Sequence, residues 1–132
     1  MSIRYDHNTM PSTDRIIDLY KSAGLRRPLQ DVARIAKMYT HSNLVVSAWD
    51  GDKLVGIARS LTDFCYCCYV SDLAVREEYK RAGIGNKLIQ ITKNIVGEES
   101  NLVLLAAPAA IDYYPKIGME KAENAFIIIR TK

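Results

Sequence analysis

Two glycines separated by one residue follow a short basic run, at Lys80-Arg81-Ala82-Gly83-Ile84-Gly85-Asn86-Lys87. The residues before this run are strand-like and those after it follow helical spacing, so the glycines mark a strand–turn–helix junction. The first N–H groups of a helix lack partners, and the helix dipole adds partial positive charge there. Glycine has no side chain, so a phosphate can approach the backbone closely. The pattern predicts a site for an anion such as a pyrophosphate.

Three classes of ligand use such a turn. A P-loop, which binds nucleoside triphosphates, requires G-x-x-x-x-G-K-[ST], and the chain lacks this spacing. A dinucleotide-binding fold requires G-x-G-x-x-G, and Leu88 stands at its third glycine position. Coenzyme A is the third class, with its pyrophosphate on the amides and its pantetheine arm along the preceding strand. A tight turn that binds nothing is the alternative interpretation of the local pattern.

Periodicity predicts the elements that must hold this junction in place. The Asp50-Gly51-Asp52 turn between two strand-like runs indicates a hairpin. The expected order is β-α-α-β-β-β-α-β-α-β, which is typical of a single α/β (α+β) domain over residues 1–132. Leu102–Ala106 is wholly apolar and predicts a buried strand. The other predicted strands are Ile3–Asn8, Leu44–Trp49, Lys53–Ser60, Phe64–Val75 and Ala125–Arg130, and the helices run from Ser12 or Thr13 to Ala23, over Leu29–His41, from Ile84 to Gly97 and from Pro108 to Ile117.

The composition excludes several classes of protein. The 132 residues are 48% hydrophobic and 25% charged, which excludes overall disorder. The net charge of +3 comes without a dense basic stripe, so nucleic acid is not an expected partner. No segment is apolar over the length needed to span a bilayer, so a membrane is not expected either. The start of the chain lacks an apolar signal core, and three clustered cysteines form no disulfide framework, so a cytoplasmic location is expected. Neither His7 nor His41 lies near these cysteines in sequence, so no metal site is expected.

Two blocks of the sequence resemble the GNAT superfamily of N-acetyltransferases. The first, Tyr69–Val75 followed by Glu78–Leu88, is similar to the acetyl-CoA-binding motif [RQ]-x-x-G-x-[GA]. The second, Ala110–Met119, is similar to the block A-x-x-F-Y-x-x-x-G-F. The resemblance covers nearly the whole chain and implies a mixed, mostly antiparallel sheet flanked by helices. Departures are Lys80 in place of Arg or Gln, Ala107 in place of Asn, Met119 in place of Phe, and Pro115 inside the expected helix.

The resemblance implies roles for particular residues. Acetyl-CoA is the implied cofactor, and CoA is the product. The backbone of Leu73, Ala74 and Val75 would meet the pantetheine arm and the thioester. The pyrophosphate would lie on the amides from Arg81 to Asn86. The residues expected at this part of the site are Lys80, Arg81, Ala82, Gly83, Ile84, Gly85, Asn86 and Lys87.

The implied reaction is direct attack of a free amine on the thioester. Tyr114 matches the tyrosine that serves the family as general acid, and a phenol is protonated at neutral pH. The amide of Leu73 is placed to stabilise the developing oxyanion. Asp72 is the acidic candidate for general base, with a structural carboxylate as an equally weighted alternative. Strand alternation predicts that Asp72 faces away from both Ser71 and Leu73.

The acceptor is open: a primary amine of a small molecule or of a peptide both fit. A binding module that holds acetyl-CoA or CoA without turnover is the alternative function. Trp49, Arg59, Tyr66 and Tyr69 would line an acceptor pocket, or else pack in the sheet or lie at its surface. For Arg59 we favour a solvated surface position, and the same holds for Arg26-Arg27. A homodimer is compatible with an apolar C-terminal strand at a sheet edge.

Overall fold

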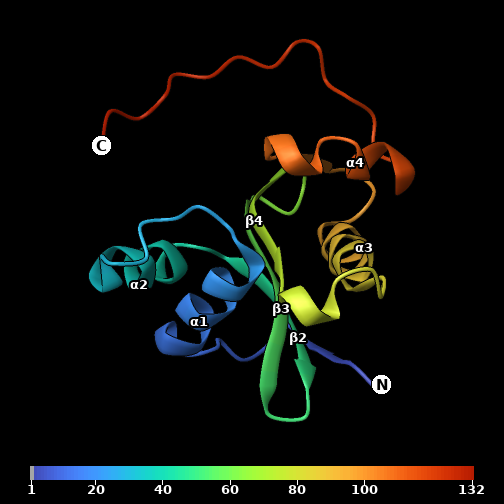
Figure 1. The fold of residues 1–132 in the computed structure, drawn as a ribbon. Coiled ribbons are helices and arrows are strands. Elements are labelled where there is room, and N and C mark those ends of the chain that lie inside the picture. Colours follow the sequence, from blue (N-terminus) through green and yellow to red (C-terminus); the bar gives the residue numbers. More distant parts are fainter. Residues whose placement is uncertain (1) are drawn as a thin grey trace.

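The computed structural model describes residues 2–132, and its centre is one sheet of five strands (Figure 1). The strands lie in chain order, β1-β2-β3-β4-β5. Neighbouring strands are antiparallel except for β4 and β5, which are parallel. This confirms the predicted mixed, mostly antiparallel sheet. The bounds are β1 Arg4–Asp6, β2 Leu44–Asp50, β3 Lys53–Thr62, β4 Cys67–Val75 and β5 Asn101–Leu104.

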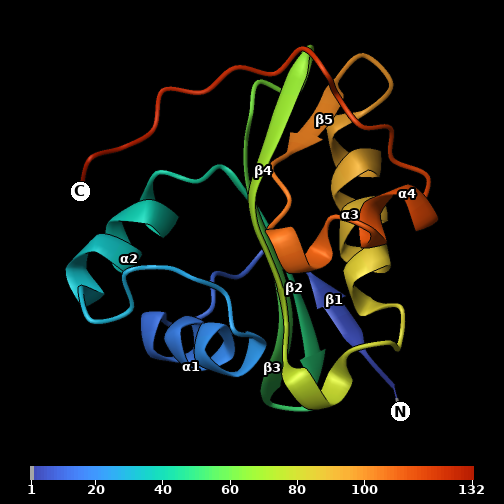
Figure 2. The ribbon, with the colours of Figure 1, turned by 45° about the horizontal axis from the view of Figure 1, so that its top comes forward.

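Helices cover both faces of the sheet (Figures 1 and 2). Helices α1 (Thr13–Ala23) and α2 (Val32–Thr40) lie on one face, and α3 (Ile84–Val96) lies on the other. The predicted cap of α1 is present, because Ser12 Oγ accepts from Arg15 N at 3.3 Å. Gly24 ends the helix with a φ of 74°, a conformation that glycine adopts without strain.

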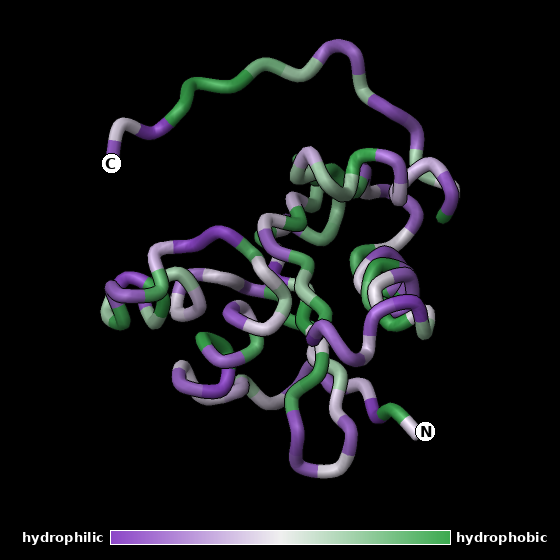
Figure 3. Tube along the Cα trace, viewed as in Figure 1, coloured by the Kyte–Doolittle hydropathy of each residue, from purple (hydrophilic) through white to green (hydrophobic). Residues whose placement is uncertain are grey.

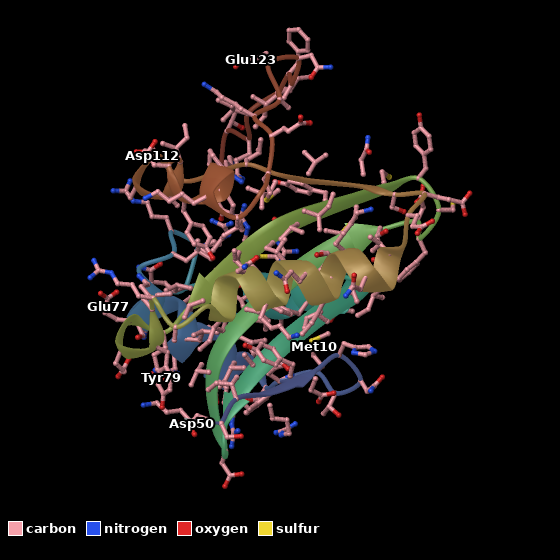
Figure 4. All side chains as sticks on the ribbon, turned by 90° about the vertical axis from the view of Figure 1, so that its right-hand side faces the viewer. Met10, Asp50, Glu77, Tyr79, Asp112 and Glu123 are labelled. Carbon is pink, nitrogen blue, oxygen red and sulfur yellow. The ribbon has the colours of Figure 1, made fainter. Side chains whose placement is uncertain are left out.

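The sheet separates two apolar clusters. Ile16, Leu19 and Ile35 of α1 and α2 pack on one face. On the other face Leu88 of α3 packs over β2 to β4, and Figure 4 shows this helix lying along the strands. Gly56 allows the approach, since a Cβ there would lie 3.0 Å from Ile84 Cγ2. The apolar face of α3, with Ile84 and Leu88 buried, therefore fixes the glycine-containing turn against the sheet.

A β-bulge in β4 reverses which face of the sheet its alternating side chains point to. Arg59 of β3 pairs with Asp72, whereas Ser60 pairs with Val70, which leaves Ser71 as an extra residue. Before the bulge, Cys68 and Val70 belong to the α3 cluster; after it, Ala74 belongs to the α1 cluster. The bulge thereby turns Asp72 toward α1 and Leu73 toward α3.

The predicted final strand is wrong. Ala125–Arg130 forms no strand in residues 2–132 and runs as an extended segment away from the sheet (Figure 1). Its apolar side chains lie in water, and Phe126 is 96% exposed. Figure 3 shows this apolar stretch within the C-terminal tail. A strand-forming composition specifies no partner edge, and within residues 2–132 the segment pairs with none.

Further differences from the prediction concern the helix after Pro108, the start of β4 and the burial of β5. The expected helix from Pro108 to Ile117 is a 3₁₀ turn, η2 (Pro108–Ala110), followed by the single-turn helix α4 (Tyr113–Lys116). Pro115 lies in the first turn of α4, where its missing N–H breaks no helical bond. The strand expected from Phe64 begins only at Cys67, because Phe64 adopts a φ of 63° in the preceding loop. β5 is not wholly buried, since Val103 is 44% exposed.

Candidate functional site

The turn between β4 and α3 leaves the first amides of α3 free of side-chain caps. β4 ends at Val75, the short helix η1 (Glu77–Tyr79) follows, and α3 begins after Gly83. Gly83 adopts a φ of 81° and makes no side-chain cap. The first helical bond runs from Lys87 N to Gly83 O at 3.0 Å, so the amides before Lys87 have no partner within the helix. Figure 4 shows η1, with Glu77 and Tyr79, at this end of α3.

The basic residues of the turn divide into two groups. Lys80 Nζ donates to Ala23 O at 3.1 Å and pairs with Glu77 Oε2 at 2.8 Å, so it ties the turn to α1. Arg81 and Lys87 are exposed and form no ion pair within residues 2–132. Arg81 also adopts a φ of 68°, which helps to reverse the chain before α3. The charge available to an anion at this helix end therefore comes from Arg81 and Lys87.

The edge of β4 beside this turn is open. β5 pairs with β4 only from Cys67 to Val70, so residues 71–75 have no strand on that side. Arg76 N donates to Val55 O at 2.8 Å, which directs this amide toward β3. Successive residues of a strand direct their amides to opposite edges. By this alternation Ala74 faces β3, while the N–H and C=O groups of Leu73 and Val75 face the open edge.

Two tyrosines of α4 lie against the same helix end. The hydroxyl of Tyr113 lies where a side chain on Gly85 would be, since a Cβ there would be 3.0 Å from it. Burial raises the pKa of Tyr113, and the nearby backbone amide of Asn86 partly opposes this shift. Tyr114 packs edge-on to Tyr113 with ring centroids 5.3 Å apart, and it is half-buried. Burial, and secondarily Tyr113, raises the pKa of Tyr114, so its hydroxyl is protonated at neutral pH.

Asp72 lies on the opposite face of β4, toward α1 and α2. Its side chain is fully buried and accepts from Arg59 Nε at 2.8 Å and from Tyr20 Oη at 2.6 Å. Arg27 Nη2 lies 2.6 Å from its other oxygen. Burial raises the pKa of this carboxyl, but the hydrogen bond and charge of Arg59, with Tyr20 and Arg27, outweigh it and hold the pKa below its usual value. This arrangement fits the structural role that the sequence left open for Asp72.

Arg59 and Arg27 are therefore not the solvated residues that we expected. Arg59 is 7% exposed, and it also donates to Ser71 Oγ at 2.8 Å. Arg27 Nη2 donates to the Ser71 carbonyl at 2.9 Å. The two guanidinium groups therefore bind the bulge from the side of α1 and α2. Their sequence signal was weak, because a single charged residue in a strand or loop does not reveal a partner far away in the chain.

The remaining acceptor-pocket candidates are not gathered together. Trp49 is buried in the cluster with α1, whereas Tyr66 is 76% exposed in the loop before β4 and Tyr69 is 40% exposed. A surface hollow also lies elsewhere, between α1 and the β2–β3 hairpin, where Asp18, Asp52 and Arg76 contribute to its lining. Neither these aromatic residues nor the hollow extends the candidate site at the β4–α3 junction.

Comparison with known proteins supplies the family. The sequence model of the acetyltransferase (GNAT) domain matches residues 18–127, which is most of the chain. The chain belongs to the GNAT family. The match includes β4, the glycine-containing turn, α3 and α4, so the junction described above is the part of the GNAT domain that the sequence motifs marked.

Relatives and solved structures agree with this assignment. GCN5-related N-acetyltransferase 2, chloroplastic, of Arabidopsis thaliana is 27% identical over 79% of this chain. The chain spans 50% of that protein's length and 58% of the length of the uncharacterized N-acetyltransferase ycf52 of Porphyra purpurea, which is 28% identical over 74% of the chain. A GNAT-family acetyltransferase structure from Streptococcus pneumoniae superposes with a TM-score of 0.77 at 23% identity, over 99% of this chain and all of the other. This last likeness shows the fold of the GNAT domain.

Two features of this GNAT domain were missed at the sequence level. Tyr113 had been noted only as an aromatic of the second block, yet its hydroxyl reaches Gly85 and Asn86. Tyr20 and Tyr39 form a hydroxyl–hydroxyl contact beside Asp72. Both tyrosines lie on the buried faces of α1 and α2, but no sequence pattern shows which group the hydroxyl of a tyrosine will contact. Within residues 2–132 no group of three His, Cys, Asp or Glu could hold a metal ion, and no helix is long and apolar enough to cross a bilayer.

Proposed function

We propose that this GNAT domain transfers the acetyl group of acetyl-CoA to a primary amine. The proposal rests on one observation: two sets of backbone N–H groups without hydrogen-bond partners lie next to each other. The uncapped amides of α3 lie next to the open edge of β4, where the N–H groups of Leu73 and Val75 face outward. A pyrophosphate suits the first set, and an extended arm with amide groups suits the second.

The residues of the turn would hold the phosphate end of the cofactor. The amides of Ile84, Gly85 and Asn86 would donate to the pyrophosphate, with Arg81 and Lys87 supplying charge. Tyr113 would join them, since its hydroxyl lies beside Gly85 and has a proton to offer an anionic oxygen. Lys80 would act indirectly, because its bonds to Ala23 and Glu77 hold the turn in place.

The thioester end would lie at the bulge. The outward amide of Leu73 would stabilise the oxygen that gains charge as the amine attacks. Tyr114 would donate its proton to the departing sulfur, because burial keeps the phenol protonated. Asp72 and the two arginines would fix the bulge that aims Leu73, and a proton acceptor for the amine is then needed from water or from the acceptor side.

The acceptor class is part of the proposal. An aminoglycoside acetyltransferase from a soil metagenomic sample, solved in complex with trehalose, has a TM-score of 0.74 to this chain at 24% identity, over 98% of this chain and 96% of its own. Small polar amines therefore head the panel of acceptors to be tested, with peptide amines beside them. Release of free CoA from acetyl-CoA, measured for aminoglycosides, polyamines, amino acids and basic peptides, is the direct test.

Replacing Tyr114 with Phe distinguishes an enzyme from a binding module. We expect turnover to fall about a hundredfold or more, because general-acid catalysis contributes at that scale. The affinity for CoA, measured by calorimetry, should change little, since the ring remains. Tyr66→Phe is the matched control, because Tyr66 is exposed in the loop before β4. CoA binding without any amine-dependent CoA release would favour the binding module, and no heat with CoA would overturn the proposal.

A further inference from the structure

The segment Ala125–Arg130 has the side chains of a buried strand but lies in water. Phe126 and Ile128 are 96% and 101% exposed, and Ile127 and Ile129 are 65% and 71% exposed. Successive residues of an extended chain point to opposite sides, so this segment is apolar on both faces. A strand that is apolar on both faces belongs in a sheet with both faces covered.

The segment touches its own domain mainly at its far end. Within residues 2–132, one hydrogen bond ties residues 120–132 to the rest of the chain, from Arg34 Nη2 to the Lys132 carbonyl at 3.3 Å. Figures 1 and 2 show the path: the chain leaves α4, crosses the top of β4 and ends on the side of α2. This path leads away from β5 of the same chain.

β5 is an edge strand of the sheet. Within residues 2–132 it pairs with β4 on one side and with no strand on the other. Asn101 N donates to Tyr66 O at 3.0 Å on the β4 side, so by alternation the amides of Leu102 and Leu104 face outward. Val103 and Leu105 are 44% and 55% exposed beside this edge. An open edge with apolar flanks readily pairs with another strand.

We propose that Ala125–Arg130 of one chain adds to the outer edge of β5 in a second copy, so that two chains exchange their C-terminal strands. Each chain carries one free strand and one free edge, and two copies related by a twofold axis satisfy both at once. The second copy is the occupant because the segment already points away from its own β5. The exchange would cover the exposed side chains and supply partners for the outward amides of β5.

Sedimentation velocity of the full chain across the micromolar range tests the exchange. We expect a dimer. The double variant Phe126→Asp/Ile128→Asp should be a monomer whose far-ultraviolet circular dichroism matches that of the wild type, because these side chains contribute nothing to the core of one chain. Ala122→Asp/Asn124→Asp adds the same charge before the strand and should remain dimeric. A monomeric wild type, or a dimer that survives the first double variant, would overturn the proposal.

Energy transfer between differently labelled chains separates exchange from any other dimer. Cys65 and Cys67 are exposed and are replaced by Ser, while Cys68 is buried and stays. One batch carries a donor dye at Ile128→Cys and the other an acceptor dye at Val103→Cys, and the two batches are mixed. Strong transfer in the mixed dimer is expected. A dimer without transfer would show that the tail lies far from the partner's β5 and would overturn the exchange.

Discussion

The two faces of β4 around the bulge are built in opposite ways. Toward α1 and α2, the carboxylate of Asp72 is buried and accepts from Arg59, Arg27 and Tyr20. On the open edge toward α3 and α4, the backbone groups of Leu73 and Val75 have no strand to bond. The buried, hydrogen-bonded side chains on the first face can hold β4 in a conformation in which the backbone N–H groups on its open edge stay unpaired. Under the proposed function, Asp72 therefore holds the strand that carries the site, and the chemistry belongs to groups on the other side.

Removing the charge of Asp72 should have the largest effect on stability. Asp72→Asn leaves Arg59 and Arg27 with no countercharge at the bulge, and breaking a buried ion pair on one side costs about 3–5 kcal/mol. Chemical denaturation measures the free energy of unfolding. Glu78→Gln is the control, because Glu78 pairs with Lys53 at 3.9 Å and both side chains are exposed, so this change should cost under about 1 kcal/mol. Equal losses in the two variants would contradict the contrast between the faces.

The same carboxylate predicts how stability depends on pH. The pKa of Asp72 in the folded protein lies below its usual value, so the folded state favours the charged form more than the unfolded chain does. Its stabilising contribution is therefore complete above the unfolded pKa of about 4 and is lost as the pH falls through the folded pKa. Thermal midpoints from pH 7 downward should fall more steeply for the wild type than for Asp72→Asn. Parallel curves would show that Asp72 does not control this range.

Sequence reasoning succeeded where local patterns determine the structure. The helical spacing after the glycine-containing turn predicted α3, and the Asp-Gly turn predicted the hairpin, because both depend on neighbours within a few residues. It failed for the partners of Arg27, which are 44 and 45 residues away. It also failed for Ala125–Arg130, since composition shows that a segment suits a strand but not which edge it joins.

A substitution at Gly85 tests the proposed phosphate site, at the place where the Tyr113 hydroxyl lies against α3. Alanine there gains about 1 kcal/mol of helix propensity, but its Cβ would lie 3.0 Å from the Tyr113 hydroxyl, and such overpacking costs about 1–3 kcal/mol. We expect Gly85→Ala to destabilise the fold slightly, and the further change Tyr113→Phe to restore it. CoA affinity should stay more than about tenfold lower in both, because the methyl group blocks the phosphate. Recovery of affinity together with stability would show that no phosphate approaches Gly85.

Arg81 and Lys87 should give the smallest effect, because both are exposed and water screens their charge. Arg81→Ala/Lys87→Ala should weaken CoA binding by about threefold to tenfold at low salt, since exposed charges contribute up to about 1 kcal/mol each. The weakening should shrink as salt is added, whereas the backbone amides keep their contribution. Lys21→Ala/Lys37→Ala removes the same charge from α1 and α2, on the other face of the sheet, and should leave the affinity unchanged. Calorimetry at two salt concentrations decides, because equal losses in both double variants would mean that net charge, rather than the end of α3, attracts the ligand.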